Sequence, residues 1–186
     1  MRIYLLRHAE STSNKANMAD SQIDAGLSAE GKKDIERLNK ELEKIRPDVF
    51  FVSPLKRTLQ TIKSFLDTVD NPVVMESELL LERDLGDYTG TPMGTFQGYC
   101  DENNLNRVTT RPPNGESLMD VYQKAMKFLE MLNNQYQDKK ILVCGSKNNI
   151  MCLQIAIEGK DIADYYSFKP FETGELRVFS LYTENH

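Results

Sequence analysis

The chain has 186 residues, of which 40% are hydrophobic and 27% charged. This ordinary composition excludes a collagen-like, disulfide-scaffold or wholly disordered chain, and the length predicts one domain over residues 1–186. The 23 basic and 28 acidic residues give a net charge of −5, so we expect no nucleic-acid partner held by a broad basic surface.

The apolar runs and the cysteines indicate the cellular compartment of the protein. The longest apolar runs, such as Val49–Val52 and Ile141–Cys144, fall far short of the ~20 residues that cross a bilayer. Cys100, Cys144 and Cys152 form no Cys-x-x-Cys pair. An odd number of cysteines without an export signal fits a reducing compartment, so we expect a cytoplasmic protein without membrane partners. The chain has two histidines, and we expect no metal and no cofactor.

The first part of the chain alternates short apolar segments with amphipathic ones. Arg2–Arg7 is a predicted strand, and Ser28–Arg46 is a predicted helix because its apolar residues recur at helical spacing. A buried strand is expected over Val49–Val52. Ser53 and Pro54 are then predicted to cap and open a helix whose apolar face runs from Leu55 to Val69.

The middle of the chain is less regular. Val73–Met75 can form a short strand, whereas Glu76–Asn114 holds several Gly and Pro residues and no long periodic stretch. We expect active-site loops or an inserted subdomain there, at about residues 76–114. Ser117 and Asp120 predict a capping box that opens a helix ending near Tyr136.

The last part returns to the strand–helix alternation. Ile141–Cys144 is a predicted buried strand, Asn149–Glu158 an apolar helix and Glu175–Tyr182 a final strand. Alternation of this kind favours an α/β fold, specifically a three-layer α/β/α sandwich around a mainly parallel sheet.

Polar residues follow three of the predicted strands. Arg7 and His8 end the first, Arg57 lies shortly after the second, and Ser146 and Lys147 follow the third. Ligands of open α/β sheets bind at the carboxyl ends of the strands. If these strands are neighbours, the cations converge around a site that suits a dianionic phosphate.

His8 has the features of a nucleophile in such a site. Neighbouring arginines disfavour its protonated form, so its pKa is expected to be lowered and its ring neutral at pH 7. We expect activity to fall below about pH 6, where an ordinary histidine protonates.

The segment Leu6–Ser11, followed by Asn14, resembles the signature of the histidine phosphatase superfamily, also called phosphoglycerate mutase-like. Further segments resemble the family in the same order, namely Asp24–Gly31, Ser53–Thr61, Leu81–Gly90 and Asn114–Ser117. The resemblance implies a phosphoglycerate mutase-like fold and hydrolysis of phosphate monoesters through a phosphohistidine. It also implies residue roles. His8 would be the nucleophile and Glu82 the general acid, while Arg7, Asn14 and Arg57 would bind phosphate.

The chain departs from the family pattern at Ala9, where glycine is usual, and after the strand Ile141–Cys144. There the family has a second histidine, whereas this chain has Ser146 followed by Lys147, and its other histidine is the terminal His186. Loss of such a donor costs roughly 2.7–4 kcal/mol of transition-state stabilisation. We therefore expect reduced activity, with Ser146 and Lys147 as candidate phosphate-binding residues.

Two other functions stay open. A non-catalytic relative would bind a phosphorylated ligand or partner protein, and a phosphomutase would transfer the phosphoryl group. The expected ligand is a small phosphorylated substrate or a phosphoprotein, and the oligomeric state is open. A thiol phosphatase built on Cys144 is excluded because Ile150 stands where its arginine is needed. Nucleotide-binding glycine loops are absent from the sequence.

Overall fold

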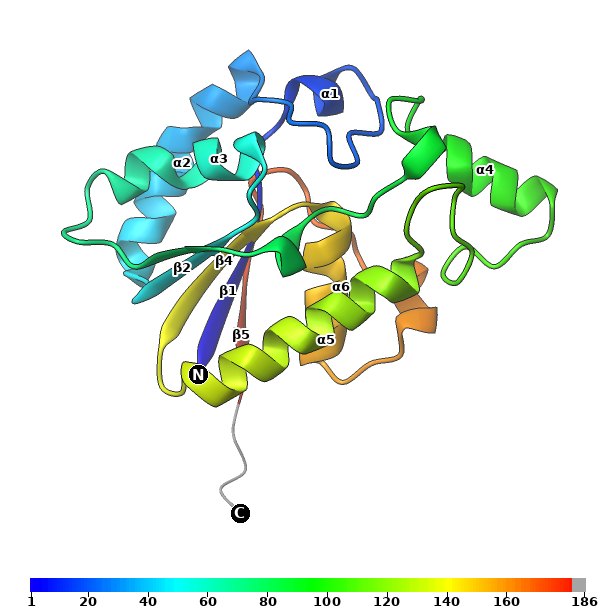
Figure 1. Cartoon of the computed structure of the whole chain (residues 1–186). Coiled ribbons are helices and arrows are strands. Elements are labelled where there is room, and N and C mark those ends of the chain that lie inside the picture. Colours follow the sequence, from blue (N-terminus) through cyan, green and yellow to red (C-terminus); the bar gives the residue numbers. More distant parts are fainter. Residues whose placement is uncertain (182–186) are drawn as a thin grey trace.

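A five-stranded sheet forms the centre of the computed structural model, which describes residues 1–181 (Figure 1). The strand order is β3-β2-β4-β1-β5. The first four of these strands are mutually parallel, and β5 pairs antiparallel with β1 at the sheet edge. The strands are β1 (Arg2–Arg7), β2 (Val49–Val52), β3 (Val74–Glu76), β4 (Lys140–Gly145) and β5 (Leu176–Ser180).

Helices cover both faces of this sheet. Figure 1 shows α2 and α3 on one face and α5 and α6 on the other, with α1 and α4 beyond the carboxyl ends of the strands. The helices are α1 (Thr12–Lys15), α2 (Ala29–Ile45), α3 (Lys56–Leu66), α4 (Thr95–Glu102), α5 (Leu118–Gln135) and α6 (Lys147–Ile157). The predicted three-layer sandwich with a mainly parallel sheet is confirmed. None of the helices within residues 1–181 has the length and apolar character needed to cross a membrane.

The two apolar layers follow from the alternation of side chains along the buried strands. In β1, Ile3 and Leu5 pack in the cluster that includes Phe128 of α5, whereas Tyr4 and Leu6 pack in the cluster on the α2–α3 face. Successive side chains of a strand point to opposite faces, so a strand covered on both sides must be apolar throughout. This is why the central strands appear in the sequence as continuous apolar runs.

Two helix starts differ from the predictions. α3 begins at Lys56 with Leu55 as its N-cap, without a capping side chain. Ser53 is not the cap, because its backbone N–H continues the sheet by donating to the Cys144 carbonyl oxygen at 3.1 Å. α6 begins at Lys147, two residues before the predicted Asn149, because Ser146 already has the extended backbone of an N-cap.

The irregular region at residues 76–114 contains a helix that was not predicted. α4 has eight residues, and its buried side chains are only Phe96 and Cys100, too few for a recognisable period. It is preceded by Gly94, whose φ of 94° favours glycine. The last strand ends at Ser180. The predicted end at Tyr182 and the terminal His186 lie outside the described residues.

Gly31 allows α2 to pack against the segment that follows His8. A Cβ atom at Gly31 would lie well inside contact distance of the Glu10 carbonyl oxygen. Gly31→Ala is therefore expected to destabilise the protein by about 1–3 kcal/mol, the usual cost of overpacking, as measured by denaturant unfolding. Gly98→Ala in α4 is the matched control. A Cβ atom there meets nothing within 4 Å, so stability should rise by about 0.5–1 kcal/mol. Equal effects of the two changes would contradict this packing account.

Candidate active site

A cavity of about 90 Å³ opens at the carboxyl ends of β1 and β4. Its charged and polar lining includes Arg7, His8, Asn14, Glu82 and Lys147. These residues come from four separate parts of the chain. β2, β4 and β1 are adjacent in the sheet, so the predicted neighbourhood of the three strand ends is confirmed.

The His8 ring is held in one tautomer. Its Nδ1 lies 2.7 Å from the Ala9 carbonyl oxygen, which can only accept, so Nδ1 carries the proton and Nε2 carries the lone pair. The backbone on both sides is anchored as well. The His8 N–H donates to the Gly145 carbonyl oxygen at 2.9 Å, and the Ala9 N–H donates to Thr61 Oγ1 at 3.0 Å. The lone pair is therefore presented by a fixed ring.

The environment of His8 keeps the ring uncharged. Burial, followed by the positive charge of Arg57 and then that of Arg7, lowers the pKa of His8 to about 3, against the opposing hydrogen bond to Ala9. The expected direction of this shift is confirmed. Its size corrects the expected loss of activity below about pH 6, because protonation of His8 itself would now occur near pH 3.

Arg7 presents an unused donor beside His8. Its Nη1 donates to the Phe171 carbonyl oxygen at 2.6 Å, whereas its Nε is buried and has no partner among residues 1–181. Buried donors without an acceptor are rare in folded proteins and often mark a site for an ion or ligand. Asn14 also lines the cavity, with its Oδ1 accepting the Ser11 N–H at 3.2 Å.

Arg57 lies behind the cavity and is fully buried, at 1% exposed. Its Nε and Nη2 donate to Ser146 Oγ at 3.2 and 3.1 Å, and other donors bind the Ser21 and Ile23 carbonyl oxygens. Asp20 is 3.7 Å from Nη1. Of the predicted phosphate-binding residues, Arg57 and Ser146 are not among the described residues that line the cavity.

Ser146 and Lys147 play different parts at the start of α6. Ser146 is the N-cap, and its hydroxyl accepts hydrogen bonds from Arg57. Lys147 is half-buried and lines the cavity. Burial, followed by repulsion from Arg7, lowers the pKa of the Lys147 ammonium. Lys147 thus adds a positive charge to the cavity, whereas Ser146 does not line it.

Glu82 lies over the first turn of α6. Its carboxylate accepts the Asn148 N–H at 3.2 Å through either oxygen, and Oε1 also accepts the Arg83 N–H at 2.7 Å. All of these donors are backbone N–H groups, and they fix the Glu82 carboxyl group at the N-terminus of α6.

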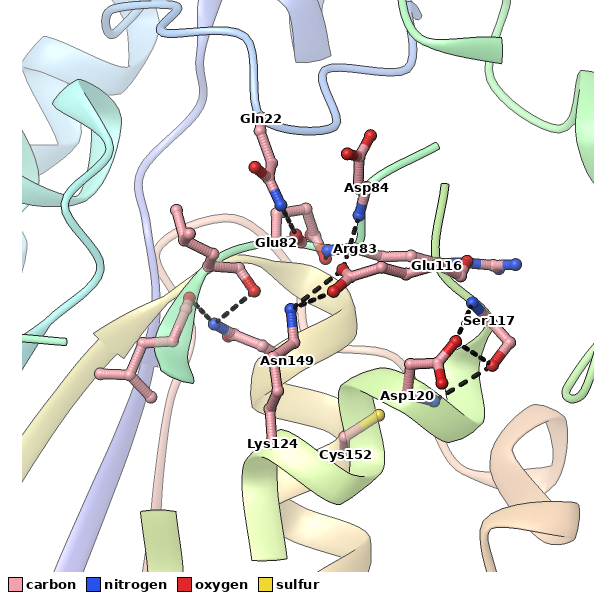
Figure 2. A network of polar contacts seen from close by, with 12 residues as sticks. Gln22, Glu82, Arg83, Asp84, Glu116, Ser117, Asp120, Lys124, Asn149 and Cys152 are labelled. Atoms are coloured by element: carbon pink, nitrogen blue, oxygen red, sulfur yellow. Dashed lines mark hydrogen bonds and ion pairs between the residues drawn. The ribbon is translucent and has the colours of Figure 1, made fainter. Parts of the chain in front are cut away.

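A polar network fixes the segment that carries Glu82, and Figure 2 shows it from close by. The Gln22 amide donates to the Glu82 carbonyl oxygen at 3.1 Å, and Asn149 donates to the carbonyl oxygen of Leu80. On the far side, Glu116 accepts the Asp84 N–H at 3.0 Å and pairs with Lys124 at 2.9 Å. The loop at Gln22, α5 and α6 therefore jointly hold the segment that carries Glu82.

Sequence reasoning missed several cavity residues. Arg83 is not among the predicted site residues, but it is 2% exposed and lines the cavity. Asp20 also lines the cavity, and its Oδ1 is buried without a partner within residues 1–181. The sequence holds no signal for either, because neither belongs to a periodic element. The segment from Leu85 to Gln97, which also lines the cavity, is predicted only as part of the irregular region at residues 76–114.

Comparisons with known proteins find curated relatives that match along most of the chain. Phosphoserine phosphatase 1 of Hydrogenobacter thermophilus is 28% identical over 173 residues, which cover 90% of this chain and 81% of the relative. A 2,3-bisphosphoglycerate-dependent phosphoglycerate mutase of a Bradyrhizobium strain is 28% identical over 166 residues, covering 84% and 80%.

Solved structures share the fold. A mycobacterial glucosyl-3-phosphoglycerate phosphatase in complex with VO3 superposes with a TM-score of 0.85 at 22% identity, covering 96% of this chain and 92% of the other. Alpha-ribazole phosphatase from Shigella flexneri gives 0.83 at 20% identity, covering 98% and 91%. A sequence profile of the histidine phosphatase superfamily (branch 1) matches residues 3–185. The chain therefore belongs to the histidine phosphatase superfamily.

Proposed function

We propose that this protein hydrolyses phosphate monoesters through a phosphohistidine formed on His8. The observation that carries the proposal is the pairing of two unused groups in one cavity. His8 presents the Nε2 lone pair of a neutral ring, and Arg7 presents a buried Nε donor without an acceptor. A phosphoryl group satisfies both. The relatives named as phosphatases support this choice.

In the first step, His8 Nε2 attacks phosphorus and the bond to the leaving oxygen breaks. The leaving oxygen takes a proton from Glu82, and Arg7 stabilises the charge on the phosphoryl oxygens. Glu82 therefore enters this step protonated and leaves it ionised, and it regains a proton from water in the second step, which closes the cycle.

In the second step, water attacks the phosphohistidine. Glu82, now ionised, takes a proton from the water, and the P–N bond breaks with its electron pair returning to His8 Nε2. Inorganic phosphate leaves.

Ser146 supplies an acceptor to Arg57 at the position where the family pattern predicts a second histidine. We infer that turnover is slower than with a histidine donor, by about a hundred- to a thousandfold, and that Lys147 partly compensates. The same observation favours a second candidate, a relative that binds a phosphorylated ligand without turning it over. A phosphomutase is a third candidate, motivated by the relatives with that name.

Replacing the nucleophile separates the first two candidates. His8→Gln should lower kcat for phenyl phosphate at least about a thousandfold, because no other described side chain presents an unprotonated ring nitrogen to the cavity. Release of inorganic phosphate is the measurement, and His186→Asn is the matched control with unchanged activity expected. Wild-type turnover no faster than that of His8→Gln would favour the binding protein.

The protonation state of His8 can be measured directly by nuclear magnetic resonance. Burial and the two arginines lower its pKa to about 3, so the ring should stay neutral from pH 8 to pH 5. In the His186→Asn variant only one imidazole remains, and its ring C–H resonances should not shift over this range. A titration with a midpoint near 6.5 would contradict the neutral nucleophile.

Lys147 is expected to bind the phosphoryl group. Lys147→Met should weaken inhibition by inorganic phosphate roughly tenfold, at the lower end of the effect of a charged hydrogen bond. Lys139→Met removes an exposed cation at the opposite end of β4 and should leave the inhibition constant unchanged. If the two variants bind phosphate equally well, Lys147 has no part in the site.

A further inference from the structure

The lining of the cavity divides into a charged base and an uncharged wall. The ionisable side chains lie at the base, where Arg7, Arg83 and Lys147 face two carboxylates, Asp20 and Glu82. The wall is formed by the segment from Leu85 to Gln97, from which Tyr88, Met93 and Phe96 reach the cavity. The only charged residue of this segment, Asp87, accepts a hydrogen bond from Asn114 and does not line the cavity.

The net positive charge of the base is about enough to balance one phosphoryl group. Three cations and two carboxylates line it, His8 is neutral, and Arg57 adds one further positive charge from behind. A phosphate monoester carries up to two negative charges. A second anionic group on the substrate would therefore find no uncommitted cation within the described lining, and it would meet the Asp20 carboxylate.

Arg83 is the lining cation that contacts the wall, and two of its nitrogens donate to backbone carbonyl oxygens. Its Nε donates to the Glu116 carbonyl oxygen at 2.8 Å and its Nη2 to that of Thr110 at 3.3 Å. The guanidinium carbon lies 5.2 Å from the centre of the Phe96 ring, in cation–π contact. Arg83 therefore supports the wall instead of offering it a free charge.

Packed aromatic rings form the centre of the wall, beside the uncharged side chain of Gln97. The Tyr88 and Phe96 rings pack edge to face with centroids 5.0 Å apart, and Tyr99 packs against both. The hydroxyls of Thr91 and Thr95 are used locally, because they donate to the carbonyl oxygens of Tyr88 and Pro92.

Met93 lies at the rim of the cavity with 44% of its surface exposed. An unbranched thioether side chain adapts to apolar ligands of different shape.

From this division we propose that the preferred substrates are phosphate monoesters of uncharged, apolar or aromatic alcohols, and that esters carrying a carboxylate or a second phosphate are disfavoured. This inference rests on the proposed phosphatase function for the identity of the ligand as a substrate. The leaving group would lie against Tyr88, Met93 and Phe96 while the phosphoryl group occupies the charged base.

Two non-hydrolysable probes test the preference without requiring turnover. Benzylphosphonate and 3-phosphonopropionate both place a CH₂ group on phosphorus, and they differ in carrying a phenyl ring or a carboxylate. By isothermal titration calorimetry, the wild type should bind benzylphosphonate at least about tenfold more tightly, the low end of what one methylene group contributes in an apolar pocket. Equal affinities, preference for the carboxylate, or no binding of either probe would overturn the inference.

Met93→Lys is expected to reverse the preference by adding a cation to the wall. The ratio of the two affinities should move towards 3-phosphonopropionate at least about tenfold. Met126→Lys is the matched control, because Met126 is a similarly exposed methionine on α5, at 48%, and it should leave the ratio unchanged. Thermal unfolding checks that both variants fold. A ratio that moves equally in the two variants, or in neither, would exclude the wall from substrate selection.

A kinetic arm distinguishes the two proposals. kcat/KM for benzyl phosphate should exceed that for 3-phosphoglycerate at least about tenfold. If neither ester is hydrolysed while the phosphonates still bind with the expected preference, hydrolysis is refuted and the ligand preference stands. If both esters are hydrolysed equally well, hydrolysis stands and the apolar preference is refuted.

Discussion

The hydrogen bond between His8 Nδ1 and the Ala9 carbonyl oxygen determines what the site can do. A carbonyl oxygen only accepts, so this 2.7 Å contact assigns the proton to Nδ1 and leaves Nε2 as the free base. The contact orders no additional backbone, because the Ala9 peptide is already held by Thr61 of α3 and the His8 peptide by β4. Burial beside two guanidinium groups then prevents protonation of the remaining nitrogen. Tautomer, orientation and charge of the ring follow from the same few contacts.

The start of α6 has a second consequence for the site. Ser146 caps this helix and accepts from Arg57, so the guanidinium is committed to Ser146 and to two carbonyl oxygens before any ligand arrives. A histidine at this place would offer an N–H donor, whereas a serine that already accepts twice offers at most its single hydroxyl proton. Positive charge within the cavity then comes from Arg7, Arg83 and Lys147. Compared with a chain that has a histidine in place of Ser146, the cavity keeps its positive charge but loses a directional hydrogen-bond donor. We therefore expect the affinity for phosphate to be less affected than the turnover rate.

Much of the fold could be predicted from the sequence, because its central strands are buried on both faces and its long helices carry regular apolar stripes. β1 and β2 have the predicted bounds, and the capping box at Ser117 and Asp120 is present. α4 could not be predicted, since eight residues with two buried side chains leave no period to detect. Arg83 could not be predicted as a cavity residue for a related reason. A charged residue in a loop is solvated unless tertiary partners enclose it, and its partners Glu116, Thr110 and Phe96 come from other loops and from α4.

The contrast between base and wall follows from how these two kinds of segment are built. Part of the base is made by the end of β1 and the start of α6, whose positions are set by the sheet. The wall is made by residues 85–97, which lie outside the sheet. They are held by their own turns, by backbone hydrogen bonds to Asn17 and Ala19 and by the packing of Tyr88 on Phe96. Changes in the wall can therefore alter the leaving group that fits without moving His8 or Arg7. Because the wall is joined to the base through Arg83, which follows Glu82 directly and stacks on Phe96, its position remains tied to the carboxylate that must reach the leaving oxygen.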